Sequence, residues 1–189
     1  MPNSFAEDRM SEWSLWVLDN GLPHLPDAVR VGESVPVAYW AGPEVGAVLH
    51  RTWAWTDDHL DDLVSDNIQC FKRDSEGWIE AGAEGGSSGG TDGRLTRLQT
   101  EPTVAHITGK FTAEQDGWVC CSIDGFAGTG IAQVEVHDSD GVTRRPHDSP
   151  LGVFIAATGD RSGAAVVLLD GENREVLRIP VGIDPNHGV

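Results

Sequence analysis

The chain has 189 residues, and its 30 acidic against 13 Lys and Arg side chains give a formal net charge of −17. This charge excludes electrostatic binding to nucleic acid or to an anionic membrane surface, since both would repel the protein. The apolar fraction of 39%, with seven Trp and five Phe, is enough for the core of one domain or of two small ones that share a core.

Residues 1–81 are predicted to be an acidic, Trp-rich β segment with one short helix. The strand-like stretches are Trp13–Leu18, Ser34–Ala41, Ala47–Trp55, Asn67–Lys72 and Gly77–Ala81. The helix is expected near residues 56–65, where Thr56 can cap the N-terminus and Leu60, Leu63 and Val64 form an apolar stripe. The pattern leaves open whether this segment extends the sheet that follows or forms a second one.

Residues 82–99 are predicted to be a flexible loop or linker, because six of the twelve residues from Gly82 to Gly93 are glycine. Glycine loses more conformational freedom on ordering than any other residue. This segment is therefore the expected boundary between residues 1–81 and a second unit at 100–182, followed by a tail at 183–189.

Residues 100–182 show regular strand signals, which predict an antiparallel β-sandwich. The expected strands are Thr103–Phe111, Gly117–Ser122, Ile131–His137, Val142–Arg145, Leu151–Thr158, Ala164–Leu169 and Glu175–Val181. Apolar and polar residues alternate along Ile131–His137, and Asp140-Gly141 then marks a hairpin turn. A second hairpin is expected through Asp170-Gly171. The fold class predicted for the chain is mainly β.

Three stretches of this region resemble immunoglobulin-like β-sandwich modules of uncharacterised actinobacterial proteins. They are V-E-V-x-D-S-D-G-V-T from Val134, P-L-G-V-F-I-A from Pro150 and A-V-V-L-L-D-G-E-N-R-E-V-L from Ala165. The resemblance covers residues 103–181 and consists of turn and core signals. It therefore implies a fold and no active site, and Asp170-Gly-Glu-Asn173 departs from the turn of those modules.

Two motifs match patterns found in functional sites, but a flexible loop and a hairpin turn explain them better. Gly86-Ser-Ser-Gly-Gly90 matches a nucleophile elbow around Ser88 but lacks the flanking strand and helix that this motif requires. Asp138-Ser-Asp-Gly141 resembles the start of a calcium loop but has Ser149 where the closing Glu is needed. No catalytic residue, metal site or cofactor is predicted.

The compartment expected for the chain is the cytoplasm. The first residues of the chain carry no secretory signal pattern, and no apolar stretch is long enough to span a membrane. Cys70, Cys120 and Cys121 are an odd number of cysteines without a pairing pattern, which favours reduced structural thiols.

The leading functional hypothesis is a non-catalytic interaction module that binds a basic protein partner, as an inhibitor or immunity-type protein does. Its expected binding residues are four carboxylates on the predicted helix and two aromatic anchors before it: Asp57, Asp58, Asp61, Asp62, Trp53 and Trp55. Aromatic anchors inside a complementary charged rim give tight and fast association.

The alternative is a small-molecule-binding β protein, or an enzyme without a motif, whose pocket would be lined by Trp40, Trp53, Trp55 and Trp118. A structural subunit of a larger assembly is a third possibility, and high acidity can also serve solubility alone. The partner, the ligand and the oligomeric state do not follow from the sequence.

Overall fold

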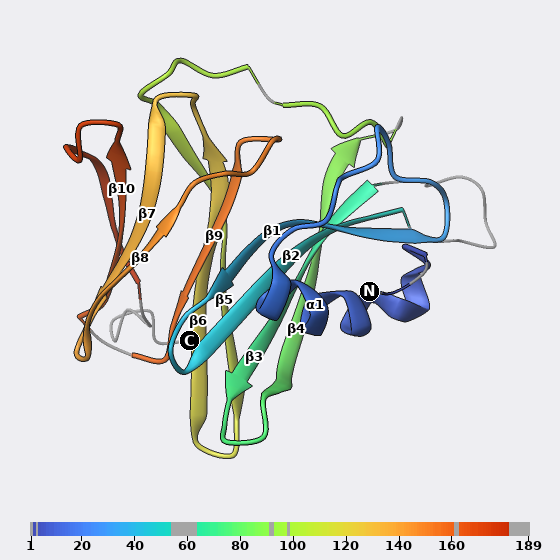
Figure 1. The fold of residues 1–189 in the computed structure, drawn as a ribbon, viewed down its shortest axis with the longest axis horizontal. Coiled ribbons are helices and arrows are strands. Elements are labelled where there is room, and N and C mark those ends of the chain that lie inside the picture. The colour runs from blue at the N-terminus through green and yellow to red at the C-terminus, as the bar shows by residue number, and fades with distance from the viewer. Residues whose placement is uncertain are drawn as a thin grey trace, which may run out of the picture.

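The computed structural model describes Pro2 and residues 4–53, 64–90, 93–97, 99–160 and 163–181. Eleven strands in these residues form three antiparallel sheets, and one α-helix lies on the first sheet (Figure 1). The mainly β class expected from the sequence is confirmed. None of the helices in the described ranges is long and apolar enough to cross a membrane.

The first sheet is a meander in the order β1-β2-β3-β4. Its strands are β1 (Glu33–Ala41), β2 (Val45–Trp53), β3 (Val64–Arg73) and β4 (Trp78–Gly90). Strands β1 and β2 are buried along almost their whole length. They pack against the helix on one face and against the second sheet on the other. A strand covered on both faces needs apolar residues at nearly every position, as β1 has at Val35–Ala38.

Helix α1 (Met10–Asn20) follows a short 3-10 turn, η1 (Glu7–Arg9), and corrects the strand predicted at Trp13–Leu18. Its buried residues are Trp13, Ser14, Val17 and Leu18, a spacing that places them on one helical face. The Trp and Val side chains favour a strand by propensity, but packing on the first sheet overrides propensity. Trp13 and Val17 join Val48 and Phe71 in a small core between α1 and this sheet.

The predicted helix near residues 56–65 is contradicted at its last two positions. Val64 and Ser65 belong to β3, where they pair with Trp53 and Thr52 of β2. Val64 is buried there, so the apolar residue that suggested a helical stripe contributes to a sheet. Residues 56–63, with the rest of that prediction, lie outside the described residues, as does the tail at 183–189.

The glycine-rich stretch is also different from the expected linker, because residues 82–90 continue strand β4 along β3. The ladder with β3 supplies the hydrogen bonds that offset the entropy glycine loses. At Gly82 a side chain would collide, since a Cβ would lie 2.9 Å from the Cβ of Ala113 in the neighbouring strand β5 (Ala105–Gln115). Glycine therefore lets these two strands approach closely.

The C-terminal strands form the other two sheets. The second sheet has the order β5-β6-β9, and the third has the order β11-β10-β7-β8. The remaining bounds are β6 (Trp118–Ala127), β7 (Ile131–Asp138), β8 (Gly141–Pro146), β9 (Val153–Thr158), β10 (Ala165–Asp170) and β11 (Glu175–Pro180). The predicted hairpins β7–β8 and β10–β11 are confirmed.

The turn between β5 and β6 was not predicted from the sequence. Asp116 and Gly117 both have positive φ, 52° and 79°, as a type I′ hairpin turn requires.

One buried apolar cluster spans all three sheets and connects residues from both halves of the chain, among them Trp40, Ile123, Phe154 and Leu168. Strand β9 is buried at every position and lies between the first and third sheets (Figure 1). Cys70, Cys120 and Cys121 lie buried within this cluster and form no disulfide. A hydrogen bond to Cys70 and burial raise the pKa of the Cys120 thiol.

Candidate functional site

A chain of polar side chains crosses the interface between α1 and the first sheet. Ser14 Oγ of α1 lies 2.6 Å from His50 Nε2 of β2 and 2.6 Å from Gln69 Oε1 of β3. His50 Nδ1 lies 3.3 Å from Ser34 Oγ, which is 2.8 Å from Thr52 Oγ1. At the other end, Gln69 Nε2 donates to Ser11 Oγ at 2.9 Å and to the exposed Glu80 carboxylate at 3.1 Å.

The direction of these hydrogen bonds follows from Glu80, because a carboxylate only accepts. The Gln69 amide therefore turns its NH₂ toward Glu80 and its oxygen toward Ser14, whose hydroxyl donates to it. Ser14 Oγ then accepts the Nε2–H of His50, and Nδ1 of the same ring lies next to Ser34. Both ring nitrogens of His50 thus have hydrogen-bond partners, and burial of the ring favours its neutral form.

The pKa of His50 agrees with a neutral ring. Burial lowers it to about 3, and a hydrogen bond to the Ser34 backbone opposes this only in part. Ser14 and His50 have no exposed surface, so no substrate can reach this serine–histidine pair. The polar chain therefore fastens α1 to the sheet and is not a catalytic site.

The acidic cavity is the first candidate binding site. It has a volume of about 430 Å³ and opens between the β1–β2 turn, the β7–β8 turn and the residues after β9. Its carboxylates are Glu44, Asp138, Asp140 and Asp160. Trp40, Val136 and Ala157 form apolar walls, and none of its lining residues within the described ranges is Lys, Arg or His.

The carboxylates of the acidic cavity are oriented by short-range hydrogen bonds. Asp138 accepts from the backbone N–H of Asp140 at 3.1 Å and from the hydroxyl of Thr158 at 3.0 Å. Asp160 accepts from the backbone N–H of Ser139 at 3.2 Å. The β7–β8 turn and the chain after β9 are thereby held together, which places Asp138, Asp140 and Asp160 at the same cavity.

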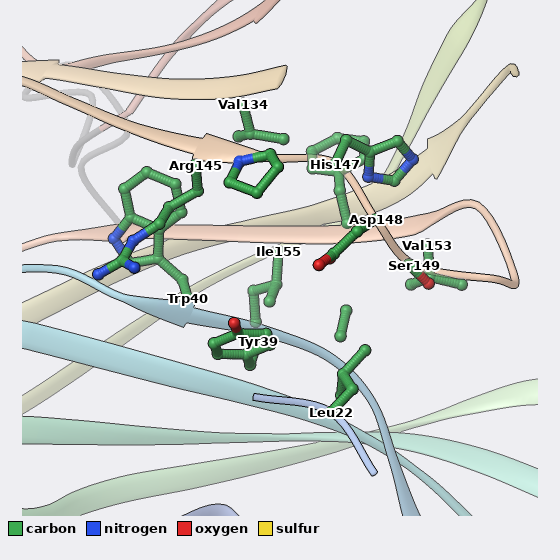
Figure 2. A pocket seen from close by; sticks show the side chains of 13 residues that line it. Leu22, Tyr39, Trp40, Val134, Arg145, His147, Asp148, Ser149, Val153 and Ile155 are labelled. Atoms are coloured by element: carbon green, nitrogen blue, oxygen red, sulfur yellow. The ribbon is translucent and has the colours of Figure 1, made fainter. Parts of the chain in front are cut away.

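A narrow crevice of about 20 Å³ lies beside the acidic cavity and shares Trp40 with it. Figure 2 shows the Arg145 side chain beside the Trp40 indole, with His147 and Asp148 farther along the crevice. The Arg145 guanidinium donates to the backbone carbonyl of Ala41 at the end of β1. It thereby bridges the third sheet to the first, and the crevice has room for about one water molecule.

His147 lines the same crevice, and burial lowers its pKa to about 4. The positive charge of Arg97 lowers this pKa further, whereas Asp148 opposes the shift. His147 Nε2 is buried and meets no hydrogen-bond partner within the described part of the chain.

A further cavity, of about 530 Å³, lies between residues 24–28, 94–97 and 150–151. It combines leucine and proline walls with Arg94, Arg97 and His24.

The residues predicted to bind a ligand or partner are not assembled at one place. Trp40 lines the acidic cavity, but Trp53 lies at the other end of the β1–β2 pair, opposite Glu33. Trp118 is half-buried at the start of β6 and packs on the core. Asp57, Asp58, Asp61, Asp62 and Trp55 lie outside the described residues.

Only part of the acidic cavity has a signal in the sequence. Asp138 and Asp140 stood out as a calcium-like turn, but Glu44 and Asp160 come from turns remote in the chain and carried no local signal. Among the described residues, no group of three or more His, Cys, Asp or Glu side chains is placed to hold a metal ion. Comparisons with family models, curated proteins and solved structures found no match for this chain.

Proposed function

We propose that the protein is a non-catalytic interaction module that binds a basic protein partner through the acidic cavity. The observation that carries this proposal is the lining of the cavity, to which the described residues contribute four carboxylates and an indole wall but no basic side chain. A Lys or Arg side chain fits this chemistry, because its aliphatic stem can pack on Trp40 while its charge meets the carboxylates.

The charge of the whole chain supports the same function. A net charge of −17 attracts a basic partner over several ångströms before contact and accelerates association at low salt. Screening by salt reduces this attraction, so both the association rate and the affinity are expected to fall as the ionic strength rises. A cavity that binds by shape alone would not show this dependence.

The test measures binding of a fluorescein-labelled peptide of alternating lysine and threonine, acetylated and amidated at its ends, by fluorescence anisotropy. The cavity variant combines Glu44→Gln, Asp138→Asn, Asp140→Asn and Asp160→Asn, which removes charge, nearly keeps the shape and retains one acceptor oxygen at each position. The control variant makes the same change in charge at exposed positions away from the cavity: Glu7→Gln, Asp8→Asn, Glu76→Gln and Glu101→Gln.

We expect the cavity variant to lose at least about tenfold in affinity, which is about 1.4 kcal/mol, and the control variant to lose much less. Equal losses in the two variants would contradict a specific site and leave only the general charge. A third variant, with Asn at positions 57, 58, 61 and 62, tests the predicted acidic helix separately. If it alone loses binding, the partner site lies there and not at the acidic cavity.

The proposal includes an immunoglobulin-like arrangement of residues 100–182. The strand order supports it, because the first, second and fifth strands of this region form one sheet and the other four form a second one. Greek-key sandwiches of this kind cluster their loops at the two ends, where they are free to bind partners.

The second candidate function is binding of a small molecule, and the cavity of about 530 Å³ favours it, since its volume suits such a ligand. The apolar walls of that cavity are leucine and proline side chains. Trp40, Trp53 and Trp118, which were expected to line a ligand pocket, are not among its lining residues. A thermal-shift screen with aromatic and aliphatic carboxylic acids tests this function. The function is supported if an acid raises the melting temperature of the natural protein and Arg97→Gln abolishes this rise. It is contradicted if none of the acids raises the melting temperature.

A further inference from the structure

Strand β8 is an edge of the third sheet. It pairs with β7 on one side, and no described strand pairs with its other side. Its residues are exposed except for Thr143, which is half-buried. Val142 is 58% exposed, the highest fraction among the exposed large hydrophobic side chains. A strand edge with free backbone groups is a template for another strand.

The register shows which backbone groups of β8 are free. The backbone N–H of His147 donates to the carbonyl of Ala132 at 2.8 Å, directly after the β7–β8 ladder. Hydrogen-bonded pairs alternate along an antiparallel ladder, so Val134–Arg145 and Val136–Thr143 are also hydrogen-bonded pairs. The N–H and C=O groups of Val142 and Arg144 therefore point away from β7, toward the open edge.

The acidic cavity lies beside this edge. Val142 and Thr143 contribute to its lining, and Thr143 shares a sheet face with the buried Val136, another residue of the cavity wall. A strand added at the edge would point alternate side chains to that same face, because side chains alternate across a sheet. Every second residue of such a strand would thus face Glu44, Asp138 and Asp140.

We propose that the β8 edge binds an extended segment of a basic protein, which adds a strand to the third sheet and points alternate Lys or Arg side chains into the acidic cavity. This inference rests on the proposed function and adds the conformation of the bound partner. Charge complementarity selects the occupant, because the four carboxylates would repel an acidic segment and leave a neutral one without a counterpart.

The test uses the alternating lysine–threonine peptide and two N-methylated forms of it, one methylated at every threonine and the other at every lysine. Both forms keep the charge and the side chains and differ only in which backbone N–H groups they lack. In antiparallel addition, the lysines face the cavity and the threonine N–H groups bond to Val142 and Arg144. We expect threonine methylation to reduce binding at least about tenfold and lysine methylation to leave it within about twofold.

Equal binding of the two methylated peptides, at whatever level, would overturn strand addition. If strand addition is overturned but the unmethylated peptide still binds the natural protein and not the cavity variant, the proposed function stands without strand addition. Failure of the unmethylated peptide to bind the natural protein would contradict the proposed function itself. Hydrogen exchange of the complex gives a second measurement, because the amides of Val142 and Arg144 should become protected whereas those of Thr143 and Arg145 already bond to β7.

Discussion

Protonation of His50 should couple the stability of the fold to pH. Burial lowers the pKa of His50 from 6.5 to about 3, so the unfolded state binds more protons than the folded state between these two values. Stability is therefore complete above pH 6.5 and decreases as the pH falls through this window. Between pH 8 and pH 5 the free energy of unfolding should fall by about 2 kcal/mol on account of His50 alone.

The variant His50→Gln isolates this effect, because its amide can still donate to Ser14 but does not titrate. Urea unfolding, followed by tryptophan fluorescence from pH 8 to pH 5, gives the free energy of unfolding of both proteins. The natural protein should lose about 2 kcal/mol more than the variant over this range. His24→Gln, at an exposed histidine, controls for the loss of a histidine as such. Parallel pH profiles for the natural protein and His50→Gln would refute the buried neutral histidine.

Two other predictions concern packing and the thiols. Gly82→Ala should destabilise the fold by about 1–3 kcal/mol in urea unfolding, because the new Cβ meets that of Ala113, whereas Gly171→Ala, with open space around it, should not. Cys70, Cys120 and Cys121 should resist an aromatic disulfide reagent in the folded protein and all react in denaturant, since burial keeps the reagent away. Rapid reaction of any thiol in the folded protein would contradict the buried cluster.

The C-terminal strands were predictable because their signals are local. Alternation along Ile131–His137 and the Asp140-Gly141 turn specify the β7–β8 hairpin without reference to the rest of the chain. Helix α1 and the glycine-rich half of β4 were not predictable in this way. The side chains of α1 fit both states by pattern, and the sheet beneath decides between them. The second half of β4 is a strand because β3 lies beside it.

The candidate site depends still more on distant partners. Glu44 and Asp160 are far apart in the sequence, and each taken alone is a common surface carboxylate. The same holds for Ser14, His50 and Gln69, which come from three elements and acquire their meaning only from mutual distances. A pattern within one segment predicts the secondary structure of that segment. A site made of several turns depends on the topology that brings these turns together, which no single segment contains.

The polar chain under α1 also determines where along its own axis the helix can rest. Apolar packing alone would tolerate a slide or a rotation of the helix, since one apolar side chain can replace another at similar cost. A shift by a single residue would bring Trp13 or Leu15 to the place of Ser14 and leave His50 and Gln69 buried without their shared partner. The hydrogen bonds of Ser14 thus select one docked position of the helix among several that would bury a similar apolar area.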